Sequence, residues 1–186
     1  MRPLGKAYKD AEASTGEFRK LPAGGYVAKI TAVEDVDDKS YLRITFDIAE
    51  GEFEAFYSDE WGKGHPYAHQ FVRSYKEGAL GMFKGFLKAI DESNGTKYEA
   101  QAEKGFAENN LVGKFVGVLI GYEEYQSTRG DIRQRTTVTG TRSIATIREG
   151  RFKVPELKTL DTPAQAPAYE SPVDGFTAVN DNDLPF

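Results

Sequence analysis

The stretch Tyr41-Leu-Arg-Ile-Thr-Phe-Asp-Ile48 alternates between polar and apolar residues from end to end. Its even-numbered residues are all Leu, Ile or Phe. They share one face of a strand, because successive side chains in a strand point to opposite faces. The odd-numbered residues, which include Tyr41 and Arg43, share the other face. The pattern predicts a β-strand with one buried face and one face that meets solvent or a ligand.

Further strands are expected on both sides of this one. Residues 26–36 are rich in strand-forming residues and end in the turn-like Asp35-Val-Asp-Asp-Lys39. Gly51 interrupts the chain after the central stretch, and residues 52–58 are predicted to form a third strand, paired with the second as a hairpin. Residues 114–125 and 132–147 have strand character again, and the Gly-containing residues 127–131 form the turn between them.

Between these two groups of strands the apolar period changes to that of a helix. Apolar residues recur every three or four positions from residue 80 to residue 90, and Lys84, Lys88 and Glu92 take the opposite face. Asn94-Gly95 is a typical helix stop. A short helical turn is expected within residues 66–75, and the pattern of residues 97–110 is ambiguous. The apolar set is Leu80, Phe83, Phe86, Leu87 and Ile90.

The expected order is therefore three strands, a helical insertion and two strands. It is the order of the five-stranded oligonucleotide-binding barrel (OB-fold), whose helix sits between strands 3 and 4. We predict a mainly β domain of this kind over residues 21–158, preceded by a flexible arm over residues 1–20. Residues 159–186 contain four prolines and few residues able to form a core, so they are predicted to be a disordered tail.

The composition excludes several classes of protein. The chain has no cysteine, which removes disulfides, thiolate metal sites and thiol catalysis. It has no apolar run of membrane-spanning length, and its first residues lack the apolar stretch of a secretory signal. We expect a soluble protein of the bacterial cytoplasm with no membrane partner.

The net charge of -5 is distributed unevenly along the chain. Residues 159–186 hold five acidic and no basic residues, so the rest of the chain is neutral overall. Residues 126–158 hold eight basic and three acidic residues, a local net charge of +5. A basic region of this kind favours contact with a phosphate backbone.

The last six residues, Asp181-Asn-Asp-Leu-Pro-Phe186, form a short docking peptide in chemical terms. They combine acids with a terminal aromatic ring and carboxylate, which a basic pocket can capture. The tip resembles the C-terminal tail of bacterial single-stranded DNA-binding proteins, which ends in acids followed by Ile-Pro-Phe. Asn182 departs from the acidic run, and Leu184 replaces Ile. The resemblance implies that Asp181, Asp183, Leu184, Pro185 and Phe186 dock onto replication, recombination and repair proteins.

The body resembles phage-encoded proteins of the same type. The similar stretches are loose motifs at residues 21–26, 111–114, 123–125 and 147–156. The resemblance implies binding of single-stranded DNA largely without sequence specificity, with no chemistry and no cofactor or metal.

Candidate DNA-binding residues follow from the fold and from the needs of a single strand. Non-specific binding requires cations along a groove and aromatic faces on which bases stack, and in this fold strands 2 and 3 and the loops after strands 1 and 4 supply them. The exposed loop tryptophan is a further candidate, with folding back onto the barrel as its alternative. The candidates are Tyr41, Arg43, Phe56, Trp61, Tyr122, Tyr125, Arg129, Arg133 and Arg135.

Other functions have less support. His65 and His69 have Pro66 between them and no third metal ligand, and no catalytic motif is present. An alternative is a recombination mediator or replisome adaptor whose barrel binds protein, because the fold does not fix the function. The sequence leaves open the choice between DNA and RNA and the oligomeric state, a homo-oligomer included.

Overall fold

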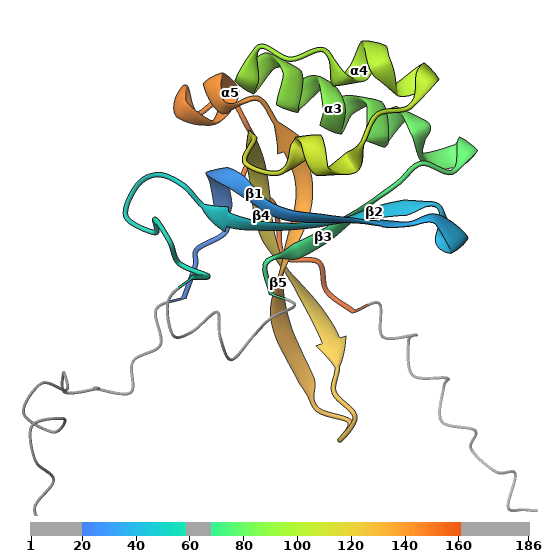
Figure 1. Cartoon of the computed structure of the whole chain (residues 1–186). Coiled ribbons are helices and arrows are strands. Elements are labelled where there is room, and N and C mark those ends of the chain that lie inside the picture. Colours follow the sequence, from blue (N-terminus) through green and yellow to red (C-terminus); the bar gives the residue numbers. More distant parts are fainter. Residues whose placement is uncertain (1–19, 59–67, 161–186) are drawn as a thin grey trace, which may run out of the picture.

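A computed structural model describes residues 20–58 and 68–160 of the chain (Figure 1). Five strands form one antiparallel sheet in the order β3-β2-β1-β4-β5, so β1 lies at the centre and pairs with both β2 and β4. β3 and β5 are the two edges of this sheet. The strands are β1 (Gly24–Val36), β2 (Tyr41–Ile48), β3 (Gln70–Ser74), β4 (Phe115–Gln126) and β5 (Ile132–Arg142).

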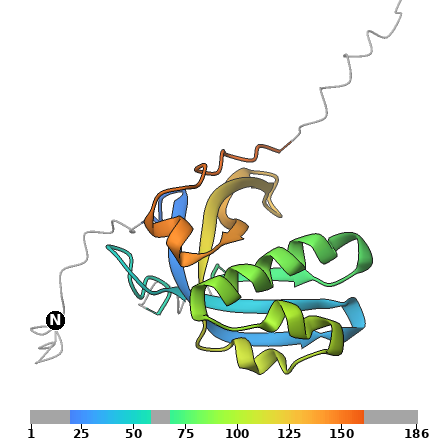
Figure 2. The same ribbon diagram turned by 90° about the horizontal axis from the view of Figure 1, so that it is seen from above.

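The helices between β3 and β4 cover one face of the sheet (Figures 1 and 2). The longest is α3 (Leu80–Asn94), followed by the short α4 (Tyr98–Gln101). The other short helices are η1 (Asp37–Lys39), η2 (Glu77–Ala79), η3 (Ala102–Lys104), η4 (Glu108–Leu111) and α5 (Ile144–Arg148). None of the helices in the described part of the chain has the length and apolar character needed to cross a membrane.

The predicted central strand is confirmed. All four apolar residues of β2 are buried, and they pack in the main core against Phe86, Leu87 and Ile90 of α3. The predicted helix and its stop are confirmed too, because α3 ends at Gly95 in a left-handed conformation with φ of 66°. Leu80 is the exception, since it is largely exposed at the start of the helix.

The predicted third strand at residues 52–58 is wrong. The chain makes a series of turns from Gly51 to Ser58, with Ala55 in a left-handed conformation at φ of 57°. Phe56 and Tyr57 are neighbours and are both buried, which a strand with one open face does not allow. The third strand is β3, within the stretch predicted as a helical turn. There Phe71 and Arg73 pair with Ile44 and Leu42 and share their face of the sheet.

The last predicted strand ends five residues earlier than expected. β5 stops at Arg142, and α5 turns the chain back over the sheet. Its Ile144 and Ile147 are buried against Val27 and Leu119, on the face of the sheet opposite the main core. The last residues of the predicted strand thus belong to a helix that buries one side.

Glycines in β1 and β4 let the segment after α5 pack directly on the sheet. A Cβ at Gly25 would lie 2.6 Å from the Phe152 ring, and one at Gly121 would lie 2.8 Å from Pro155. The segment then runs beside β4, where the Lys158 amide donates to the Tyr122 carbonyl at 2.9 Å and the Glu124 amide donates to the Lys158 carbonyl at 2.9 Å. The C-terminal end of the described chain is therefore fixed next to β4.

Gly85→Ala is expected to stabilise the protein by about 0.5–1 kcal/mol, because glycine in a helix interior is less favourable than alanine by about this amount. A Cβ at Gly85 meets nothing within 4 Å, so the added methyl group causes no clash. Thermal unfolding followed by circular dichroism checks the rise. Gly95→Ala is the matched contrast, and it should lower the melting temperature because the φ of Gly95 is positive. Equal shifts in the two variants would contradict this account.

Candidate nucleic-acid interface

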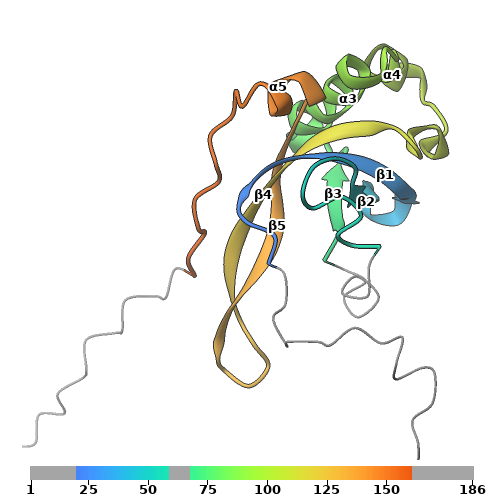
Figure 3. The same cartoon turned by 90° about the vertical axis from the view of Figure 1, so that its left-hand side faces the viewer.

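The β4–β5 hairpin projects beyond the rest of the sheet. β1 pairs with β4 only from Phe115 to Ile120, whereas β5 pairs with β4 as far as Gln126. Residues 121–137 therefore form a two-stranded arm that extends away from α3 and α4 (Figures 1 and 3).

One face of the arm carries the predicted aromatic and basic residues together. Tyr125 lies opposite Arg133, and Glu123 lies opposite Arg135, so the four side chains share a face. The Arg135 guanidinium lies 5.3 Å from the centre of the Tyr125 ring and pairs with Glu123 at 2.6 Å. Arg133 is 3.8 Å from Asp131. Both arginines are exposed, as is Arg129 in the turn.

Exposed ion pairs of this kind contribute at most about 1 kcal/mol each. A phosphate can therefore replace Asp131 as the partner of Arg133 at little cost, because both side chains are exposed. The interleaved ring and guanidinium groups give this face the two features that a single strand needs, which are a stacking surface and cations.

Tyr122 does not join this face. Its side chain lies on the opposite side of β4, and its hydroxyl donates to the Leu21 carbonyl at 2.6 Å. Tyr26 anchors the same segment by donating to the Pro22 carbonyl at 2.7 Å, and burial raises the pKa of Tyr26 to about 12, with a further contribution from Tyr122. Tyr122 thus holds residue 21 at the root of the arm and lies on the face opposite Tyr125, Arg133 and Arg135.

Tyr57 connects the turns after β2 to the root of the arm. Its side chain hydrogen-bonds Thr136 of β5, and burial raises the pKa of Tyr57 well above its ordinary value. Phe56, beside it, is only 7% exposed and packs edge-on against Phe53 and Tyr57. The Phe56 ring therefore belongs to the main core in this structure and not to the exposed strand surface on which it was expected.

The polar face of β2 holds the other predicted pair. Arg43 donates to the Tyr41 hydroxyl at 3.2 Å and pairs with Glu34 at 2.6 Å, and these contacts raise its pKa, the one with Tyr41 most. This face points away from the core and from α3. The arm extends on that side of the sheet too (Figure 3), so the two groups of residues flank the same side of the molecule.

Sequence reasoning missed one residue of this surface. Val72 of β3 lies opposite Arg43 and is 53% exposed. An exposed valine beside an arginine supplies an apolar contact for a base. The stretch Gln70-Phe-Val-Arg-Ser74 does not alternate between polar and apolar residues, so its sequence pattern gave no signal for a strand here.

Two predicted groups lie outside the described residues, namely Trp61 and the tip residues Asp181, Asp183, Leu184, Pro185 and Phe186. Within residues 20–58 and 68–160, no group of three histidine, aspartate or glutamate side chains is placed to hold a metal ion.

Comparison with known proteins gives no further assignment: no protein-family model matches the chain, and a search of curated proteins finds no match.

Proposed function

We propose that this protein binds single-stranded DNA largely without sequence specificity. The observation that carries the proposal is the shared face of Tyr125, Arg133 and Arg135 on the projecting arm. Bases stack on the tyrosine and phosphates meet the arginines, with Tyr41 and Arg43 of β2 on the same side of the sheet. Stacking of one base contributes about 1–3 kcal/mol, and each phosphate contact adds a salt-dependent term.

The sheet order supports an OB-fold as the framework of this site. In that fold the surface of strands 2 and 3 and the loop between strands 4 and 5 bind the strand. Here β1 pairs with both β2 and β4, and α3 lies between β3 and β4 in the chain. Tyr57, in the turns after β2, hydrogen-bonds Thr136 of β5, and α3 contacts both β3 and β5. These contacts connect the two edges of the sheet, and those are the edges that meet when such a sheet closes into a barrel.

In the proposed mechanism the protein covers exposed single-stranded DNA in the bacterial cytoplasm and catalyses no reaction. Residues 181–186 recruit replication, recombination or repair proteins. Because the tail tethers this tip to the DNA-binding domain, it raises the local concentration of these proteins at the DNA. Lys158 pairs with β4 beside the arm, so the linker starts next to the proposed DNA-binding face. Removal of residues 181–186 should abolish capture of such partners and leave DNA binding intact.

Fluorescence-anisotropy titrations of labelled single-stranded and double-stranded oligonucleotides, each at two salt concentrations, test the proposal. We expect binding to single strands that weakens with salt, because counterions compete for the phosphates, and much weaker binding to duplex. An equal affinity for both, or no binding to either, would overturn the proposal. In that case the adaptor whose barrel binds protein is the better assignment. A single-stranded RNA of the same sequence, in parallel, decides between DNA and RNA.

A further inference from the structure

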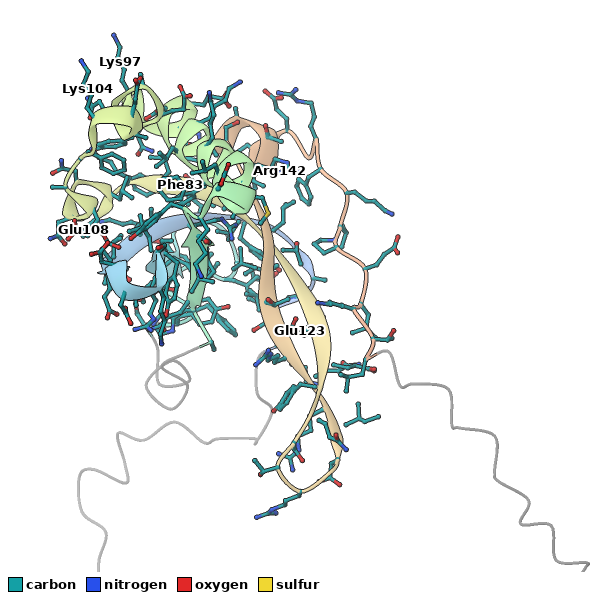
Figure 4. All side chains as sticks on the ribbon, turned by 90° about the vertical axis from the view of Figure 1, so that its right-hand side faces the viewer. Phe83, Lys97, Lys104, Glu108, Glu123 and Arg142 are labelled. Carbon is teal, nitrogen blue, oxygen red and sulfur yellow. The ribbon has the colours of Figure 1, made fainter. Side chains whose placement is uncertain are left out.

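A basic groove lies between α3 and the end of β5, away from the tip of the arm. Its volume is about 880 Å³, and it is bordered by α3, by the end of β5 and by residues 153–156. Arg73 of β3 and Arg142 of β5 both line it, so it lies between the two edge strands of the sheet. We call it the seam groove. Figure 4 shows Arg142 at the upper end of β5, next to α3 and α5.

Arg73 is a cation without an anionic partner among the described residues. Its guanidinium lies 4.6 Å from the centre of the Phe71 ring and 5.9 Å from that of Phe86, and one of its nitrogens donates to the Val72 carbonyl at 3.0 Å. Burial lowers its pKa to about 10. A guanidinium has five N–H donors, so most of them remain for a ligand. Removing a charge from water without an ion pair is unfavourable, and an anion in the groove offsets that cost.

Arg142 is the second cation that no carboxylate neutralises among the described residues. It donates to the Thr141 carbonyl at 2.8 Å and is otherwise exposed. The two lysines of the groove differ, because Lys88 is 4.0 Å from Glu92 and Lys153 is 2.5 Å from Glu156. The net positive charge of the groove therefore rests on Arg73 and Arg142.

The walls of the groove suit a phosphate chain. The Ser143 and Thr146 hydroxyls bond each other at 3.0 Å, which leaves one of their two hydrogens for a ligand. On the α3 side, a Cβ at Gly81 or Gly85 meets nothing within 4 Å, so the helix surface is open. The side chain of Met82, which is 71% exposed, adds an apolar contact beside the cations.

We propose that the seam groove binds backbone phosphates of the same single strand that the arm holds, with Arg73 and Arg142 as the charged contacts. This inference rests on the proposed function. β5 connects the two places, since it carries Arg135 on the arm and Arg142 in the groove. The seven residue steps from Arg135 to Arg142 span about 23 Å at 3.3 Å per residue. An oligonucleotide must therefore be long enough to reach the groove, and a short one occupies the arm alone.

The test is a length series of single-stranded oligonucleotides, from roughly 4 to 16 nucleotides, the range of sites for one such domain. R73Q/R142Q is expected to weaken the longest by about tenfold and to leave the shortest unchanged. Loss of two phosphate contacts should also lower the slope of log affinity against log salt by about 1.4 for the long oligonucleotide. K97Q/K104Q removes the same charge from the far side of α4, where Figure 4 shows both lysines, and should change neither.

Two further variants keep the result interpretable. R142Q alone avoids the buried Arg73, and G85L narrows the groove without removing charge; each should reproduce part of the length-dependent loss. Inorganic phosphate and chloride are then compared as competitors at the same ionic strength. If the groove binds the DNA backbone, phosphate should displace the long oligonucleotide no better than chloride does. Stronger displacement by phosphate would indicate a site for free phosphate. A wild type that binds oligonucleotides, with R73Q/R142Q and G85L unchanged at every length, overturns this inference alone. A wild type that binds none overturns the proposed function as well.

Discussion

Reversal of two charges on the arm, in R133E/R135E, is expected to weaken binding of single-stranded DNA about a hundredfold at low salt. Each reversal replaces an attraction to phosphate by a repulsion, for which we expect about tenfold, or 1.4 kcal/mol. Arg135 also stacks on Tyr125, so its loss leaves the proposed base-stacking ring without its neighbour. Anisotropy titration of a labelled oligonucleotide, with wild type and variant side by side, measures the effect.

The matched control is K97E/K104E, which changes the net charge by the same amount. Lys97 and Lys104 are exposed next to α4, on the side of the sheet away from the arm (Figure 4). If binding depends on overall charge, the two double variants will lose affinity equally, and the arm will have no special part. If it depends on the arm, the control will bind nearly as the wild type does.

Charge reversal at Arg135 also puts a second carboxylate opposite Glu123, which disfavours the hairpin by up to about 1 kcal/mol. The neutral variant R133Q/R135Q removes this objection, because it introduces no like-charge pair. We expect it to bind about tenfold more weakly than the wild type. A loss confined to the charge-reversed variant would point to distortion of the arm and not to lost phosphate contacts.

Strand and helix periods in the sequence were sufficient for most of the framework. The alternation in β2 and the helical spacing of α3 each reflect burial on one side, which the structure confirms. The turn residues between β4 and β5 set the hairpin, so the shared face of Arg133 and Arg135 followed from their spacing alone. These features depend on local pattern, and local pattern can be predicted from the sequence.

The errors came from contacts between distant parts of the chain. Phe56 was assigned to an exposed face because a strand was expected there, whereas residues 51–58 form turns whose last two residues donate to the carboxylate of Asp47. Tyr122 is of a residue type that stacks on bases, but its hydroxyl donates a hydrogen bond to the carbonyl of Leu21, 101 residues away. No pattern in the sequence reports such a partner. Arg73 was missed for the same reason, since it lines a groove only once β3 and β5 are brought near α3.

Asp47→Ala is expected to destabilise the protein by about 3 kcal/mol, the largest effect of any single substitution proposed here. Asp47 is only 9% exposed. Its carboxylate accepts from the backbone amides of Ile48 at 2.8 Å, Tyr57 at 2.9 Å and Ser58 at 3.0 Å, and from the Ser58 hydroxyl. A hydrogen bond to a charged group contributes about 1.5–3 kcal/mol, and buried donors left unpaired add to the loss. For a domain of this size the melting temperature should fall by about 10 °C.

Asp38→Ala is the control, because Asp38 is an exposed aspartate in η1 and the variant should melt within about 1 °C of the wild type. Asp47→Asn keeps one acceptor oxygen and should fall between the two. A D47A variant that melts like the wild type would show that residues 51–58 are held by the packing of Phe56 and Tyr57 alone.

Comparing D47A with R133Q/R135Q distinguishes residues that support the site from residues that contact DNA. Asp47 fixes Tyr57, and Tyr57 bonds Thr136 at the root of the arm. D47A should therefore weaken DNA binding indirectly, by loosening the root, and the loss should shrink on cooling as the folded state becomes more populated. R133Q/R135Q should weaken binding with no change in melting temperature, since both arginines are exposed and their ion pairs contribute little. If both outcomes are observed, the arginines contact the DNA directly, and Asp47 acts only by stabilising the root of the arm.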